Sequence, residues 1–147
     1  MLQQLFAGTV ANLAELGAAD VLSAEEVRAL SRDPLVTIGG HSISHPALRE
    51  LDEQACRREI RGSRERLVAI TGAPVDHFAY PFGNRAAYGP REEQLAHESG
   101  YKTAATTCAR QLASTDRPTA LPRVMLTAEL DVLTGLRALL TGWFGHR

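Results

Sequence analysis

The sequence predicts an α/β fold with a mostly parallel sheet, built as a single domain of 147 residues. Short apolar runs rich in β-branched residues alternate with stretches whose apolar residues recur every three or four positions, the pattern of strands separated by helices. Glycine, proline and aspartate mark the boundaries between these stretches. In such folds ligand sites lie beyond the carboxyl ends of the strands, so the loops that follow predicted strands are the first candidates for function.

The N-terminal part is predicted to be mainly helical. Residues 1–21 form an expected amphipathic helix and turn, because their leucines, phenylalanine and valine share one helical face. Ser23 and Glu26 fit the two ends of a capping box, which predicts a second helix to about residue 31. The apolar, β-branched run over 35–38 then predicts a buried strand.

The same signals place the remaining elements. Apolar periodicity identifies the helices, β-branched runs identify the strands, and glycine or proline ends each helix. In order, the expected elements are a helix from Asp52 that ends at Gly72, a strand over 75–80, a helix over 90–99, a strand over 101–107, a polar loop over 108–120, a strand over 121–126 and a closing helix over 128–140.

Composition argues against two classes of partner. The formal net charge is -1 and the basic residues are scattered, so no surface for nucleic acid is expected. No apolar run approaches the ~18 residues of a membrane span, and the N-terminus has no basic region followed by an apolar core. The expected location is therefore the cytoplasm.

Cys56 and Cys108 are expected to be buried free thiols.

The candidate metal ligands are His41 and His45. They lie four residues apart directly after a predicted strand, and Gly39 and Gly40 allow a sharp turn into their loop. Five histidines produce such a spacing by chance roughly one time in six, so the spacing alone is weak evidence. The strand end and the neighbouring serines, which can orient imidazoles, strengthen it. Imidazole is a common zinc ligand, and a hydrolytic zinc site needs at least three protein ligands.

Two loops carry motifs of a known family. The string His41-Ser42-Ile43-Ser44-His45 matches the pattern His-(Ser/Thr)-x-x-His, and Tyr80-Pro81-Phe82-Gly83 matches Tyr-Pro-(Phe/Tyr)-Gly. With these strings, and with segments 100–104 and 121–124 in the same order, the chain resembles the polysaccharide deacetylases, the NodB-homology group of carbohydrate esterases. The resemblance covers about residues 22–127 and leaves a C-terminal helix and tail at 128–147.

The resemblance implies both architecture and activity. The implied fold is a partial (β/α) barrel of the polysaccharide deacetylase type, with mostly parallel strands and with its first strands missing. The implied enzyme is a metal-dependent hydrolase that removes N-acetyl groups from an amino-sugar polysaccharide or oligosaccharide. Its partner would be an N-acetylated glycan, and its cofactor a divalent metal, zinc before cobalt, nickel or iron.

Site roles follow from the same resemblance, residue by residue. His41 and His45 would bind the metal together with an aspartate, and a second aspartate would be the general base. The backbone amide of Phe82 would donate to the oxyanion. The implied substrate-binding residues are Tyr80, which would shape the sugar groove, Pro81 and Arg123.

The chain departs from the family at four points. The first motif, a Thr-Phe-Asp-Asp string that supplies both aspartates, has no counterpart, so the general base is expected to be missing. Ala79 stands where an arginine often opens the third motif, and no Leu-x-x-His follows later. The predicted strands are also fewer than the roughly eight of a closed barrel.

We expect the missing strands and aspartates to belong to sequence upstream of Met1. A missing segment or an oligomer would then cover the open sheet edge. In a naturally shortened relative, the helix over 2–16 would cover it instead.

Three hypotheses for function remain open. The first is a polysaccharide deacetylase, inactive or impaired as this truncated chain. The second is a catalytically dead glycan- or metal-binding remnant of the same fold. The third is a structural or partner-binding α/β domain in which the two histidines brace a loop.

Overall fold

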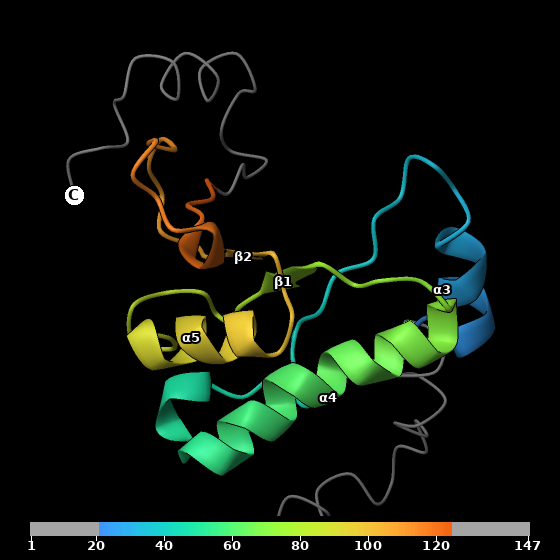
Figure 1. The fold of residues 1–147 in the computed structure, drawn as a ribbon, viewed down its shortest axis with the longest axis horizontal. Coiled ribbons are helices and arrows are strands. Elements are labelled where there is room, and N and C mark those ends of the chain that lie inside the picture. Colours follow the sequence, from blue (N-terminus) through green and yellow to red (C-terminus); the bar gives the residue numbers. More distant parts are fainter. Residues whose placement is uncertain (1–20, 125–147) are drawn as a thin grey trace, which may run out of the picture. The chain divides into compact units, whose positions relative to one another are not determined.

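The structure is a computed structural model that describes residues 21–124, and Figure 1 shows their helices and strands. The chain divides into two units, Met1–Thr37 and Ile38–Arg147. The predicted helices over 2–16 and 128–140 lie outside the described residues.

Helix α3, Ala24–Leu30, is the one helix among the described residues of the first unit. The Ser23 hydroxyl accepts the Glu26 N–H at 3.2 Å, and the Glu26 carboxylate accepts the Ser23 N–H at 2.7 Å. The bond from the Ser23 N–H, together with the Ser23 hydroxyl, holds the pKa of the Glu26 carboxyl below its ordinary value. The predicted capping box is therefore confirmed.

The predicted strand over 35–38 is wrong. The Asp33 carboxylate accepts the Leu35 N–H at 2.8 Å, and the Asp33 carbonyl accepts the Val36 N–H at 3.0 Å. Both donors therefore serve a turn instead of a strand ladder. Leu35 is 93% exposed, in place of the expected burial. The chain pairs with the sheet at Gly40 instead.

The longest described helix is α4, Glu53–Thr71 (Figure 1). The Asp52 carboxylate accepts the Ala55 N–H at 2.7 Å, and Gly72 ends the helix in the left-handed region with φ 69°. Its buried residues are Cys56, Ile60 and Ser63. The predicted boundaries of this helix are confirmed.

Asp52→Ala is expected to lower the free energy of unfolding by about 1 kcal/mol, because the first turn of α4 loses its side-chain acceptor. Urea denaturation of the full chain measures the loss. Gln54→Ala is the matched control, since Gln54 is exposed in the same turn. Equal stability of the two variants would contradict a role for Asp52 in capping.

The sheet is parallel throughout its described part. Strand β1, His77–Ala79, pairs in parallel with β2, Thr103–Ala105 (Figure 1). Parallel single-residue bridges join Gly40 to Phe78 and Ala105 to Leu121. The segments therefore lie in chain order, as successive β/α units require. The predicted strands over 75–80 and 101–107 are confirmed in shorter form, while the run from 121 shows one bridge within the described residues.

Helix α5, Pro90–Glu98, connects β1 to β2 and confirms the predicted helix over 90–99. Its first turn contains Glu92, which is almost fully buried and accepts the Gly89 N–H at 2.7 Å. Arg91 pairs with the same carboxylate at 2.6 Å. The Gly89 N–H and the Arg91 guanidinium thus compensate the buried charge of Glu92 locally.

The core is rich in aromatic rings from the strands and the loops that follow them. Tyr80 stacks on Tyr88 with ring centroids 4.5 Å apart, and Phe78 contacts both Tyr80 and Tyr101 edge-on or tilted. Cys56 is fully buried in this core, as predicted, and burial with the neighbouring Glu92 raises the pKa of its thiol to about 11. Cys108 is only half-buried, and both thiols are free.

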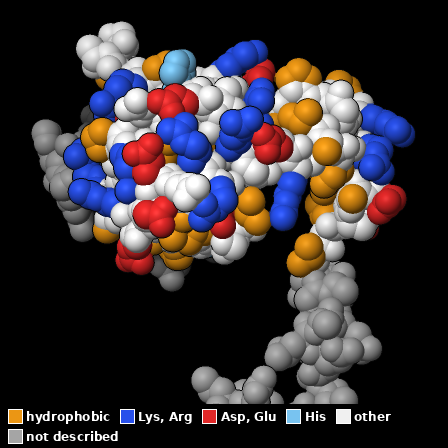
Figure 2. All heavy atoms as spheres, turned by 60° about the horizontal axis from the view of Figure 1, so that its bottom comes forward, with side chains coloured by type: hydrophobic (Ala, Val, Ile, Leu, Met, Phe, Trp, Pro, Cys, Tyr) orange, Lys and Arg blue, Asp and Glu red, His pale blue; other side chains and the backbone are white. Residues whose placement is uncertain are grey.

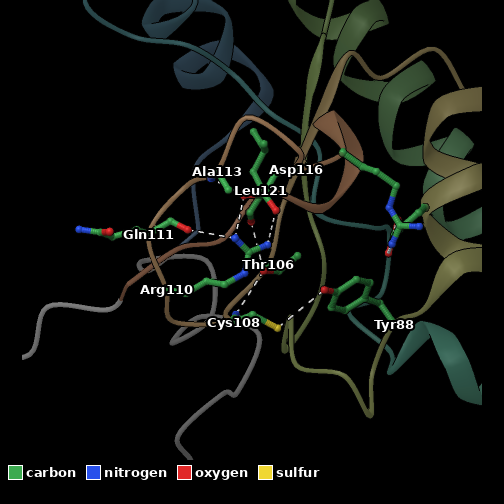
Figure 3. A network of polar contacts seen from close by, with 10 residues as sticks. Tyr88, Thr106, Cys108, Arg110, Gln111, Ala113, Asp116 and Leu121 are labelled. Carbon is green, nitrogen blue, oxygen red and sulfur yellow. Dashed lines mark hydrogen bonds and ion pairs between the residues drawn. The ribbon is translucent and has the colours of Figure 1, made fainter. Parts of the chain in front are cut away.

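The loop after β2 is organised by an ion pair between Arg110 and Asp116 (Figure 3). The Asp116 carboxylate also accepts the Ala113 N–H at 2.7 Å, and these contacts lower its pKa to about 2. Cys108 lies within 3.8 Å of the Tyr88 hydroxyl. The predicted polar loop over 108–120 is therefore a loop with its own internal polar contacts, except for its last three residues, which form the short 3-10 helix η2, Pro118–Ala120.

Basic and acidic side chains are interspersed on the face shown in Figure 2. On α4, Arg57 pairs with Glu53 and with Glu98 of α5, and Arg61 pairs with Glu65. This is the charge pattern of a solvated helix face. Across residues 21–124, no helix has the length and apolar character needed to cross a membrane.

Candidate functional site

The structure brings His41 and His45, the histidine pair, together. Their loop, residues 41–47 (the histidine loop), leaves the sheet directly after the bridge at Gly40. The two ring centroids are 4.8 Å apart, with planes at 70°. Both residues are exposed. The pair therefore lies at the carboxyl edge of the parallel sheet, where ligands of α/β folds bind.

A hydrogen bond to the backbone fixes the orientation of the first ring. His41 Nδ1 lies 2.7 Å from the Ala79 carbonyl oxygen. A carbonyl can only accept, so Nδ1 carries the proton and donates it. In the neutral ring the lone pair is then on Nε2. A metal-binding imidazole commonly has this arrangement, because the bond to a backbone carbonyl orients the ring and raises its basicity.

The histidine loop has an unusual backbone. Ser42 and His45 adopt φ values of 65° and 60°, in the left-handed region that disfavours residues with a side chain. Each such residue costs on the order of 1 kcal/mol. Strain of this kind persists only where surrounding contacts enforce it.

Helix α4 supplies those contacts. The Glu59 carboxylate accepts the Ile43 N–H at 2.8 Å, the Ser44 N–H at 2.9 Å and the Ser44 hydroxyl at 2.7 Å. Partial burial raises the pKa of Glu59, but the bonds from Ser44 and Ile43 outweigh it and lower the pKa overall. One helical turn later, the Ser63 hydroxyl accepts the His41 N–H at 3.3 Å.

Sequence reasoning missed the contribution of Glu59. A glutamate on a helix rich in arginine is ordinarily a solvated surface residue. The sequence did contain a signal for this role. Glu59 immediately precedes Ile60, a buried residue of α4, and it lies about one helical turn before Ser63.

Phe82 lies beside the pair. The residue is 56% exposed, and its ring contacts the His45 ring edge-on, with centroids 4.9 Å apart. Its backbone is left-handed, with φ 60°. The Phe82 carbonyl accepts the Thr107 hydroxyl at 2.8 Å, while the Phe82 N–H has no acceptor among residues 21–124. The Phe82 N–H therefore has no internal partner within this part of the chain, in a residue whose ring contacts His45.

Gly83 explains how this loop passes so close to the next one. Its φ is 64°, and a Cβ there would lie 2.8 Å from the Thr107 nitrogen. The Thr107 N–H donates to the Gly83 carbonyl at 2.8 Å. The glycine of the Tyr80 to Gly83 motif is therefore required by the close approach of the loops after β1 and β2.

Two of the predicted substrate contacts lie in the core instead. Tyr80 is 1% exposed, and its hydroxyl donates to the Thr119 carbonyl at 2.8 Å. Burial raises the pKa of this hydroxyl. Pro81 is also fully buried. Side chains this deeply packed anchor the loop after β1, and they offer almost no surface to a glycan in this structure.

Arg123 is exposed and lies two residues beyond the bridge at Leu121. Its N–H donates to the Cys108 carbonyl at 3.3 Å. In the described part of the chain, no carboxylate pairs with its guanidinium. Its proposed contact with a glycan stays a prediction.

The donor chemistry of the pair suits zinc, which takes imidazole nitrogen readily. A pocket of about 350 Å³ is lined by His41, Gly39 and Ser63 but not by His45, so it is not a space shared by the two rings. Within residues 21–124, however, no group of three or more His, Cys, Asp and Glu side chains could hold a metal ion. The described residues thus fit two ligands of a site that ordinarily has at least three.

Comparisons with known proteins address the family and the fold. The family profile "Polysaccharide deacetylase" matches residues 7–104, more than half of the chain, and this range contains both motif strings. No curated protein sequence matches the chain at a significant level.

Solved structures of deacetylases share the fold. The Streptococcus pyogenes deacetylase PplD in complex with acetate has a TM-score of 0.75 at 20% identity, covering 88% of this chain and 56% of that one. The polysaccharide deacetylase BC0361 from Bacillus cereus has a TM-score of 0.69 at 24% identity, covering 81% and 37%. IcaB from Ammonifex degensii has a TM-score of 0.65 at 20% identity, covering 74% and 49%.

This chain therefore spans about half or less of the length of these relatives. The predicted α/β fold of the deacetylase type is confirmed as a partial one. Since the family profile covers more than half of the sequence, the chain belongs to the polysaccharide deacetylase family.

Proposed function

We propose that this chain carries part of the active site of a metal-dependent enzyme that removes N-acetyl groups from an amino-sugar polysaccharide or oligosaccharide. The observation that carries the proposal is the histidine pair, with rings 4.8 Å apart at the carboxyl edge of a parallel sheet. The family match supports the class of reaction. One structural neighbour is a deacetylase solved with acetate, the acid that hydrolysis of an N-acetyl group releases.

In this proposal the histidine pair binds a divalent metal, most simply zinc. His41 would bind through Nε2, because its Nδ1 proton is donated to the Ala79 carbonyl. A divalent metal held there would supply Lewis acidity, which lowers the pKa of a bound water and polarises the acetamide carbonyl.

Phe82 is proposed to stabilise the transition state through its backbone. When water attacks the acetamide, negative charge develops on the carbonyl oxygen, and an N–H directed at that oxygen stabilises it. The Phe82 N–H has no acceptor among the described residues and lies in the residue that contacts His45.

Deacetylation also needs a base that takes the proton of the attacking water. The sequence has no counterpart of the Thr-Phe-Asp-Asp string that would supply this base, and among residues 21–124 no carboxylate joins the histidine pair in a metal-binding group. We therefore propose that this chain on its own is impaired in catalysis. The same observation, together with Ala79 at the position where the family often has arginine, favours a second candidate, a catalytically dead glycan- or metal-binding remnant of the same fold.

Acetate release from N-acetylglucosamine oligomers tests the two candidates. With saturating zinc, the full chain is expected to release acetate slowly but faster than its His41→Ala variant, and a chelator should reduce the rate to that of the variant. If the full chain releases acetate no faster than its His41→Ala variant, the deacetylase hypothesis is ruled out for this chain. Retained zinc binding would then favour the remnant.

A further inference from the structure

Glu59 contacts the part of the histidine loop that separates the two ligands. Its three accepted hydrogen bonds come from Ile43 and Ser44, which lie between the histidines in sequence. Hydrogen bonds to an ionised acceptor are roughly twice as strong as neutral ones. We propose that Glu59 is a positioning residue that holds the histidine pair in a metal-binding arrangement; this inference rests on the proposed function.

The backbone of the loop gives the positioning a physical reason. The loop has two non-glycine residues in the left-handed region, Ser42 at one end and His45 at the other. Without further contacts, a loop with these side chains would favour other backbone conformations. The bonds to Glu59 fix its centre, and the Ser42 hydroxyl accepts the His45 N–H at 3.0 Å at its end.

A rigid element provides the anchor. Glu59 and Ser63 are four residues apart on α4 and are therefore neighbours on one helical face. Glu59 binds the middle of the loop, and Ser63 accepts the His41 N–H at 3.3 Å at its start. Ser63 and the adjacent Ile60 are both buried, so this part of the helix is packed against the core.

Glu59 is also distinguished from the other glutamates of its helix. Glu53 pairs with Arg57, and Glu65 pairs with Arg61, as exposed helix residues commonly do. Within the described residues, the hydrogen bonds of Glu59 all come from the histidine loop, and no arginine or lysine forms an ion pair with it. The hydrogen bonds that the Glu59 carboxylate accepts in this part of the chain therefore all hold the histidine loop.

Three variants of the full chain test the inference. Glu59→Ala removes all three bonds, Glu59→Gln keeps an oxygen for the two backbone donors but loses the charge, and Glu65→Gln is the matched control on the same helix. Zinc affinity is measured by competition with a chromophoric chelator. Glu59→Ala is expected to weaken zinc binding about tenfold or more, Glu59→Gln less, and Glu65→Gln not at all.

A second readout needs no metal. In the metal-free chain, nuclear Overhauser effects between the two imidazole rings and slow exchange of the Ile43 and Ser44 amide protons report the held loop. Glu59→Ala should lose both signals, and Glu65→Gln should keep them. If Glu59→Ala fails to fold, Glu59→Gln decides, through faster amide exchange and weaker zinc binding than Glu65→Gln.

The outcomes separate this inference from the proposed function. A wild-type chain that binds no zinc overturns the metal site, whereas the ring contacts and amide exchange still decide the role of Glu59. The inference is overturned if the Glu59 variants and Glu65→Gln show the same ring contacts, the same amide proton exchange and the same zinc affinity.

Discussion

His41→Ala is expected to weaken zinc binding by the full chain about a hundredfold or more. Even partners that only orient a metal ligand are worth roughly 10-fold to 100-fold in affinity, and His41 is proposed as one of the two ligands present in the described residues. The loss of its ring also removes the bond to the Ala79 carbonyl. Competition with a chromophoric chelator measures the change.

A second histidine provides the matched control. His97 is exposed on α5, outside the histidine loop, so His97→Ala removes one imidazole at a distance in sequence from the pair. The control should bind zinc as the unmodified chain does. Equal zinc affinity of the two variants would mean that the histidine pair only braces its loop.

Gly40→Ala is expected to destabilise the fold by about 1–3 kcal/mol, because the new methyl group has no space. A Cβ at Gly40 would overlap the Tyr101 hydroxyl oxygen and would lie 3.1 Å from a ring carbon of Phe78. Tyr101 cannot move away easily, since it is 1% exposed and donates to the Ile60 carbonyl at 3.3 Å. Thermal and urea unfolding measure the loss.

Two further variants check the cause. Gly89→Ala is the matched control, because the nearest atom to a Cβ there, at 3.5 Å, is in ordinary contact and its backbone is extended. Tyr101→Phe in the Gly40→Ala background removes the atom of closest contact and should recover part of the lost stability. Gly40→Ala as stable as Gly89→Ala would contradict the packing described for the start of the histidine loop.

Local signals in the sequence predicted most of the described elements. Helix α4 follows from an aspartate cap, an apolar stripe and a glycine stop, and each of these acts within a few residues along the chain. The strand expected over 35–38 fails for an equally local reason. The Asp33 side chain takes the Leu35 N–H into a turn, a competition that β propensity does not include.

The two candidate metal ligands could be predicted from the sequence, but the residues that hold them in place could not. The spacing and loop position of the histidine pair were visible in the sequence. Its geometry depends on Glu59, 15 residues further along from Ser44, and on the carbonyl of Ala79, 38 residues from His41. Contacts between residues so far apart leave no periodic pattern. The burial of Tyr80 is likewise set by tertiary packing, in its stack on Tyr88.

The central claim is that the histidine pair binds one divalent metal through both imidazoles. X-ray absorption spectroscopy at the zinc edge, on the full chain with one equivalent of zinc, tests it most directly. We predict two imidazole nitrogens at about 2.0–2.1 Å from the metal, and one in His45→Ala. A zinc shell without imidazole scattering, or one unchanged in His45→Ala, would contradict the claim.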